Sequence, residues 1–312
     1  MHWRNATPPR PTPADMAPTL HPLRRAYADW MGGQIHYRHA GQGRAVILLG
    51  GAPRSGGQFE PVMEMLAAQG MLAIAPDIPG FGGSTAQPAG TTMEDRAECL
   101  VPVLDALGVD RAIVFGLHSG HKLGAAFAAR HIDRTAGLIV AGKSHSIGVD
   151  QAQRNSTVRG AVLERYFING ADEVDGPDPM RGWTAQWRSL TKLWWDDAIH
   201  TAPDKILMLR ALENRIIDDL AARRTVRDFY SANFAFDLSA ALAAVRAPAL
   251  IVEITSDGED ASIGRQGAGM AALMADAKIC EIKETDPIGL FFHIGFDAVA
   301  HLIMTFAASL EH

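Results

Sequence analysis

The chain has 312 residues, of which 47 % are hydrophobic and 21 % are charged, a balance that is typical of globular proteins and excludes a disordered or fibrous chain. The formal net charge of −6 provides no basic surface for nucleic acid or for an anionic membrane. We therefore expect a small molecule as the main partner. The two cysteines, Cys99 and Cys280, predict neither a disulfide framework nor a metal site.

The first 24 residues are rich in proline, which blocks both helices and strand ladders. We expect this segment to form an extended arm. It contains no signal-type apolar stretch, and no apolar run in the chain reaches the roughly 18 residues that a membrane span needs. The expected location is therefore the cytoplasm. The oligomeric state is left open, with a homodimer as one alternative.

Next come strand patterns alternating with helix patterns. Residues 25–41 alternate polar and apolar side chains and predict an antiparallel hairpin that turns at Gly32-Gly33. Runs that are apolar on both faces are typical of central parallel strands. Strand and helix taking turns predict a parallel α/β sheet covered on both faces. The expected strands are 45–49, 71–75, 112–116, 137–141, 249–254 and 278–283, and the expected helices are 93–107, 119–130, 268–275 and 296–310.

The pattern changes between residues 146 and 237, where helices rich in Arg, Asp and Trp replace the strands. This block interrupts the α/β pattern, which resumes after it. We therefore divide the chain into an arm at 1–24, a core made of 25–145 and 238–312, and a helical cap at 146–237.

Three motifs carry a family likeness: Leu48 to Pro53 (LLGGAP), Ala75 to Ser84 (APDIPGFGGS) and Gly116 to Gly120 (GLHSG). In this order and spacing they resemble the α/β-hydrolase fold family, over residues 26–145 and 247–310. The resemblance implies a mostly parallel eight-stranded sheet with helices on both faces and a helical cap insertion. No cofactor is expected.

The third motif departs from the family at its centre. In α/β-hydrolases the G-x-S-x-G elbow holds the nucleophile on a sharp turn between a strand and a helix. Here His118 has that place, and the segment 125–134 resembles the following helix and its exit without a gap. An imidazole there can act as a general base, as a nucleophile or as a hydrogen-bond donor. The alternative is a decayed site with a neutral histidine.

The family likeness also implies an oxyanion hole made by the backbone N–H groups of Ala52 and Ser119. These donors do not depend on a serine side chain at position 118. Asp77, in the second motif, is expected to stabilise its turn. The first turn of the helix that begins at Ser119 adds a partial positive charge to the same place.

The remaining two members of a triad should follow the last two strands. Asp257 is the expected acid, with Asp260 second, by resemblance to the family. The catalytic histidine should stand where this chain has Leu290, and His293 lies three residues later. We take His293 as a candidate that either reaches the site or packs under the last helix. Ordinary Ser-His-Asp acyl transfer is not supported by this register.

Other candidates border the expected pocket. Arg54 and Ser55 follow the oxyanion turn and can hold a polar group of the substrate, although a surface arginine is an equal alternative. Ligands of open α/β sheets bind at the carboxyl edge of the strands. The expected cap contains a helix with one apolar face, which either packs in the core of the cap or covers the pocket. No histidine pair has metal-ligand spacing, so no metal is expected. The further candidates are Lys143, Ser144, His145, Trp183 and Trp187.

Three functions remain open after these observations. The first is an enzyme acting on a small, mostly apolar carbonyl compound (an ester, lactone, thioester or β-diketone) through His118 and a backbone oxyanion hole. The second is a lyase or proton-transfer enzyme that forms no acyl intermediate. The third is a non-catalytic pseudo-hydrolase that binds a ligand.

Overall fold

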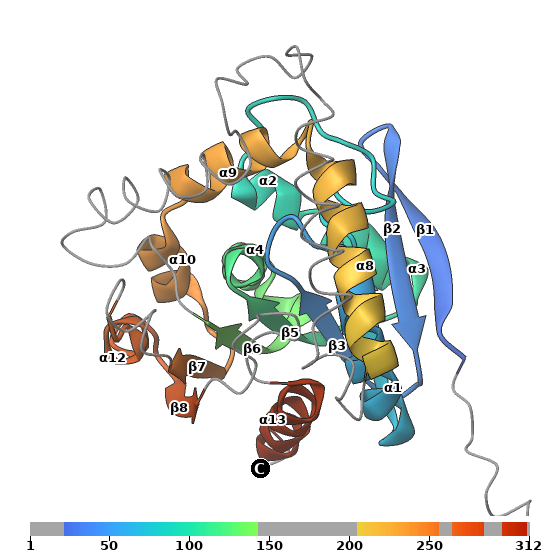
Figure 1. Ribbon diagram of the computed structural model, residues 1–312. Helices are drawn as coiled ribbons and strands as arrows, with labels where there is room; N and C mark the ends of the chain where they lie inside the picture. The colour runs from blue at the N-terminus through green and yellow to red at the C-terminus, as the bar shows by residue number, and fades with distance from the viewer. Residues whose placement is uncertain (1–21, 143–204, 256–263, 284–294, 311–312) are drawn as a thin grey trace, which may run out of the picture.

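The computed structural model describes residues 22–142, 205–255, 264–283 and 295–310 (Figure 1). Its centre is an eight-stranded sheet with the order β1-β2-β4-β3-β5-β6-β7-β8, antiparallel at β1, β2 and β4 and parallel from β4 to β8. The predicted fold class is confirmed. The strands are β1 (Arg24–Trp30), β2 (Gly33–Ala40), β3 (Arg44–Leu49), β4 (Met71–Pro76), β5 (Ala112–Leu117), β6 (Thr135–Ala141), β7 (Ala249–Thr255) and β8 (Ala277–Lys283).

Helices cover both faces of the sheet, as the alternating pattern predicted (Figure 1). One face packs on α1 and α13, and the opposite face packs on α2, α3, α4 and α10. The central strands β3 and β5 are buried on both sides because each is apolar at successive positions. The helices are α1 (Glu60–Ala68), α2 (Met93–Ala97), α3 (Leu100–Ala106), α4 (Ser119–Arg130), α8 (Lys205–Ala222), α9 (Val226–Ala235), α10 (Leu238–Ala244), α12 (Gly267–Ala271) and α13 (Phe296–Ser309).

Two details of the expected elements change. The hairpin turns at Met31-Gly32, one residue earlier than expected, and both residues have positive φ, as a two-residue hairpin turn requires. The helix expected at 93–107 divides into α2 and α3, although Thr92 caps its start by accepting a hydrogen bond from the Asp95 N–H. Pro102 accounts for the division because it has no N–H to donate to the carbonyl of Glu98.

The arm and much of the expected cap lie outside the described residues, so the domain boundaries stay predictions. The described end of the insert is helical, in α8 and α9. A buried arginine, Arg96 of α2, joins α9 to the core by pairing with Asp228 and by donating to the Pro79 carbonyl. Within the described ranges, no helix has the length and apolar character needed to cross a membrane.

Candidate functional site

The chain makes a sharp turn at His118, between β5 and α4. His118 has φ 49° and ψ −120°, a left-handed conformation that costs a non-glycine residue about 1–3 kcal/mol. Ser119, in contrast, is the first residue of α4. The His118 N–H donates to the Ala141 carbonyl at the end of β6, 2.9 Å away. The surrounding fold thus holds the turn in place despite its strain.

The two glycines that flank this turn allow a close approach of backbone segments. A Cβ added at Gly116 would lie 2.3 Å from the His121 Cα, and one added at Gly120 would lie 2.3 Å from the Leu49 carbonyl oxygen. Both contacts are closer than real Cβ atoms make, and both involve backbone atoms that cannot rotate away. The steric need for glycine therefore explains why the elbow motif keeps both of them.

We expect Gly120→Ala to lower the free energy of unfolding by about 3 kcal/mol, since the added methyl group forces backbone apart in a packed core. Urea denaturation checks this value. Gly269→Ala is the matched control: Gly269 lies in α12 with nothing within 4 Å of an added Cβ. There, alanine should be neutral or slightly stabilising. Equal stability of the two variants would contradict the steric explanation.

The His118 side chain lies between the ends of two neighbouring strands. A Cβ added at Gly142, which follows β6, would lie 2.6 Å from the His118 Nδ1, and one added at Gly51, which follows β3, would lie 3.5 Å from the His118 Cβ. Since β3 and β6 flank β5, the imidazole stands at the carboxyl edge of the parallel strands. This edge is where open α/β sheets bind ligands. The His118 side chain is partly exposed there.

His121 and Lys122, in the first turn of α4, are buried rather than open to solvent. The His121 Nδ1 donates to the Ala141 carbonyl over 3.1 Å. The Lys122 Nζ donates to the Asn233 carbonyl of α9 over 2.6 Å, and burial lowers the pKa of Lys122 to about 7. These side chains fix α4 against β6 and α9.

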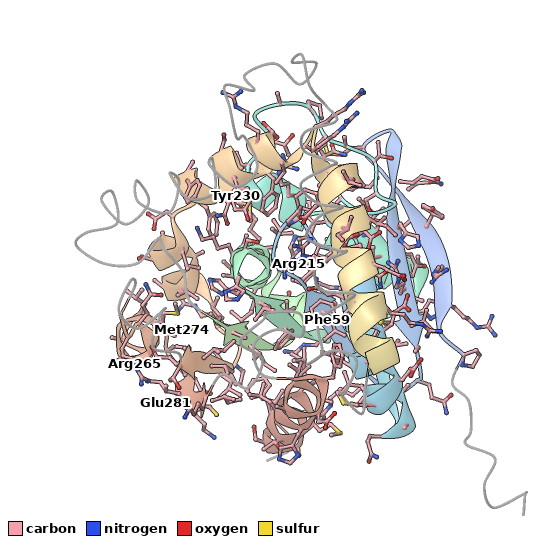
Figure 2. The ribbon with its side chains drawn as sticks, in the orientation of Figure 1. Phe59, Arg215, Tyr230, Arg265, Met274 and Glu281 are labelled. Carbon is pink, nitrogen blue, oxygen red and sulfur yellow. The ribbon has the colours of Figure 1, made fainter. Side chains whose placement is uncertain are left out.

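The two residues expected to form the oxyanion hole lie side by side. The Ala52 N–H donates to the Ser119 Oγ at 2.7 Å. The Tyr230 hydroxyl, on α9 (Figure 2), donates to the Ala52 carbonyl at 3.2 Å. The Ala52 N–H is thus directed at the Ser119 side chain.

Arg54 and Ser55, two of the expected substrate-binding residues, contact α8 in this structure. The Arg54 Nη1 donates to the Asp219 carboxylate at 2.9 Å and to the Arg215 carbonyl at 2.8 Å (Figure 2 labels Arg215). Ser55 donates through both its N–H and its Oγ to Asp218. Burial raises the pKa of Asp218, and the hydrogen bonds from Ser55 and the charge of Arg54 only partly oppose it. These contacts attach α8 to the loop after β3.

Asp77 contacts the loop after β3 through the Gly56 N–H and is almost fully buried. It accepts hydrogen bonds from the His36 Nδ1 at 2.8 Å, the Arg38 Nη1 at 3.0 Å, and the N–H groups of Gly56 and Gly83 at 2.7 and 2.8 Å. Burial alone would raise its pKa, but the His36 hydrogen bond, the Arg38 charge and the two N–H groups together lower it. The expected turn-stabilising role is confirmed.

Several expected site residues lie outside the described residues, so nothing here places them relative to His118. Among the residues that the structure describes, no three His, Cys, Asp or Glu side chains form a group that could hold a metal ion. The sequence interpretation missed Asp218, Asp219 and Tyr230, whose helical segments carry no local signal for a contact with residues 52–55. The expected residues outside the described ranges are Asp257, His293, Lys143, Ser144, His145, Trp183 and Trp187.

Comparison with known proteins places the chain in a family. The family model described as "alpha/beta hydrolase fold" matches residues 44–177. A Caulobacter vibrioides protein named "Putative carbamate hydrolase RutD" is 31% identical over 201 residues, which are 61% of this chain and 72% of that protein. The 2-hydroxy-6-oxo-6-phenylhexa-2,4-dienoate hydrolase of Burkholderia cepacia is 35% identical over 117 residues, 35% of this chain and 40% of the relative. The chain thus spans about two fifths of that hydrolase.

Solved structures share the fold at low sequence identity. A thermophilic esterase from Thermogutta terrifontis superposes with a TM-score of 0.65 at 20% identity, covering 93% of this chain and 100% of the esterase. The enol-lactonase from Burkholderia xenovorans LB400 has a TM-score of 0.62 at 21% identity and covers 91% and 100%. Taken with the family model and the Caulobacter relative, the fold and its motifs show that this chain belongs to the α/β-hydrolase fold family.

Proposed function

We propose that this chain is an enzyme that acts on a small, mostly apolar carbonyl compound such as an ester, lactone, thioester or β-diketone, with His118 at the reacting centre. The observation that carries the proposal is the strained turn at His118, whose imidazole lies at the carboxyl edge between Gly51 and Gly142. The names of the relatives, which include a hydrolase of a dienoate, support a carbonyl substrate.

The strain itself supports a function for this side chain. A histidine with positive φ costs free energy that the surrounding packing has to offset. Residues with strained backbone conformations cluster at active sites. The two flanking glycines keep the geometry that makes the strain necessary. In a decayed site, in contrast, nothing would oppose a glycine at position 118, which would relieve the strain.

His118 can perform two kinds of chemistry in this place. As a base, the imidazole takes a proton from a water that attacks the carbonyl carbon, and the carbonyl electron pair moves to the oxygen. The pair returns as the bond to the leaving group breaks, and the imidazolium gives its proton to that group. As a nucleophile, an imidazole nitrogen bonds to the carbonyl carbon, and the bond to the alkoxide, thiolate or enolate breaks as that group leaves and takes up a proton. Water then hydrolyses the acyl-imidazole to the acid and frees the imidazole. In both cases negative charge develops on the carbonyl oxygen, next to the segments that carry Ala52 and Ser119. Asp257 and His293 remain our candidates for a charge partner and a second acid or base.

A proton-transfer or lyase reaction without an acyl intermediate is the second candidate. It is favoured by the residue at the turn, since His118 replaces the hydroxyl or thiol that usually becomes acylated, and by the Ser119 Oγ, which is engaged by the Ala52 N–H. In such a reaction the imidazole removes a proton from the carbon beside the carbonyl. The electron pair of the broken C–H bond forms an enolate, and a later protonation returns the proton.

The proposal is tested by assaying the purified protein against nitrophenyl esters, small lactones, thioesters and β-diketones, followed by labelling with a serine-directed phosphonate. We expect turnover of at least one of these classes and no phosphonate adduct, because no serine stands at the strained turn. A stoichiometric adduct on Ser119 would contradict the role of His118. Tight binding of these compounds without any consumption would instead indicate a ligand-binding protein.

A further inference from the structure

We propose that the side-chain hydroxyl of Ser119 donates the hydrogen bond that stabilises the developing negative charge on the substrate, with the Ala52 N–H acting through it. This inference rests on the proposed function and deepens it. It differs from the usual arrangement in the family, in which two backbone N–H groups contact the oxyanion directly.

The hydrogen bond between Ala52 and Ser119 determines how the hydroxyl can act. A serine hydroxyl has one O–H donor and two acceptor positions. The Ala52 N–H, 2.7 Å from the Ser119 Oγ, takes one of the acceptor positions. Throughout the described ranges, the Ser119 side chain has no other hydrogen bond. We infer that it donates its own proton to the substrate.

Ser119 lies next to His118, the residue that we propose at the reacting centre. Ser119 follows His118 directly and is partly exposed, whereas the next residue, Gly120, is buried against the carbonyls of Leu49 and Gly50. A substrate oxygen that approaches Ala52 meets the Ser119 hydroxyl before it can reach the N–H. The hydroxyl thus stands between the backbone donor and the substrate.

The chemistry of this pair favours donation over nucleophilic attack. Hydrogen bonds in a chain polarise one another, so an Oγ that accepts from an N–H donates its own proton more strongly. The same N–H withdraws electron density from the Oγ, which makes it a weaker nucleophile. In addition, α4 has twelve residues, and its first turn carries partial positive charge beside the developing anion. The Ser119 proton stays on the Oγ throughout, so the step needs no further proton acceptor.

The variant Ser119→Ala tests the inference. Removing one oxyanion donor costs about 10²-fold in kcat in enzymes of this general kind, and we expect a loss of this size with little change in KM. Ser119→Thr is the matched control, because it keeps a hydroxyl at the same position and should retain most of the activity. If Ser119→Ala is as active as the wild type, or more active, the hydroxyl only covers the Ala52 N–H and the inference is wrong.

A binding measurement separates this inference from the proposed function. The probe 4-nitrophenolate carries a charged oxygen that imitates an enolate and can be titrated by absorbance without any turnover. We expect Ser119→Ala to weaken its binding about tenfold and Ser119→Thr to bind like the wild type. Unchanged binding in Ser119→Ala, or no binding to the wild type, overturns the inference. If binding depends on Ser119 while no substrate is consumed, the donor stands and the proposed enzymatic activity fails.

Discussion

Replacing His118 with alanine is expected to lower kcat by at least about 10²-fold, the usual contribution of a general base. The imidazole is the titratable group that the strained turn holds between Gly51 and Gly142, at the carboxyl edge of β3, β5 and β6. The alanine variant should fold, because histidine and alanine both have a Cβ and the substitution adds no backbone strain at the positive φ. Steady-state kinetics on whichever carbonyl substrate the wild type consumes measures the effect.

Two further variants make this result specific. His131→Ala removes another histidine, at the opposite end of α4, where its Nε2 contacts the half-buried Glu98 2.9 Å away, and it should leave kcat unchanged. Gly142→Ala should reduce activity while His118 remains, since the added Cβ would lie 2.6 Å from the His118 Nδ1. Unchanged turnover in His118→Ala would remove this residue from the mechanism and leave the acid–base role to another group.

The sequence was sufficient to predict the elements that local physics determines. The runs 45–49 and 112–116 are apolar on both faces, and they form the buried strands β3 and β5. The helix expected at 119–130 has the bounds of α4 because a sharp turn opens it and small residues continue it. The position of His118 between glycines placed it at that turn. These features depend on periodicity and on steric limits within a few residues.

The contacts around the loop after β3 could not be predicted in the same way. Ser55 and Asp218 are 163 positions apart, and nothing local in α8 indicates that its acidic pair faces the residues after the oxyanion turn. The hydrogen-bond partner of the Ala52 N–H could not be predicted from the sequence either. Motif comparison assigns that N–H to a substrate, whereas the position of the Ser119 Oγ depends on how α4 packs against the loop. Both results come from tertiary packing, which periodicity does not encode.

A large loss of stability is expected when Asp77 is replaced. The variant Asp77→Ala should lower the free energy of unfolding by about 3–5 kcal/mol, the usual cost of removing one partner from a buried ion pair. It removes one of the two carboxylates that pair with Arg38, whose side chain is 13% exposed, and leaves Glu60 as the other. It also leaves the N–H groups of Gly56 and Gly83 without their acceptor. Urea denaturation followed by circular dichroism at neutral pH gives the difference.

A surface pair of similar geometry provides the control for Asp77. The Asp105 carboxylate lies 2.7 Å from the Arg134 Nη2, but its side chain is 60% exposed, so Asp105→Ala should cost at most about 1 kcal/mol. Equal losses in the two variants would show that burial does not determine the contribution of Asp77.

The pH dependence gives an independent check, because the pKa of Asp77 is lower in the folded chain than its ordinary value of 3.8. Its stabilising contribution is complete above that ordinary value and is lost as the pH falls through the lower, folded pKa. The difference between wild type and Asp77→Ala should therefore shrink only in acid, below about pH 4. Asp218, whose pKa is raised, acts with the opposite sign and favours the folded state as its carboxyl becomes protonated. Since Asp77→Ala keeps Asp218, a difference that instead grew in acid would assign the stabilisation to the neutral form of Asp77.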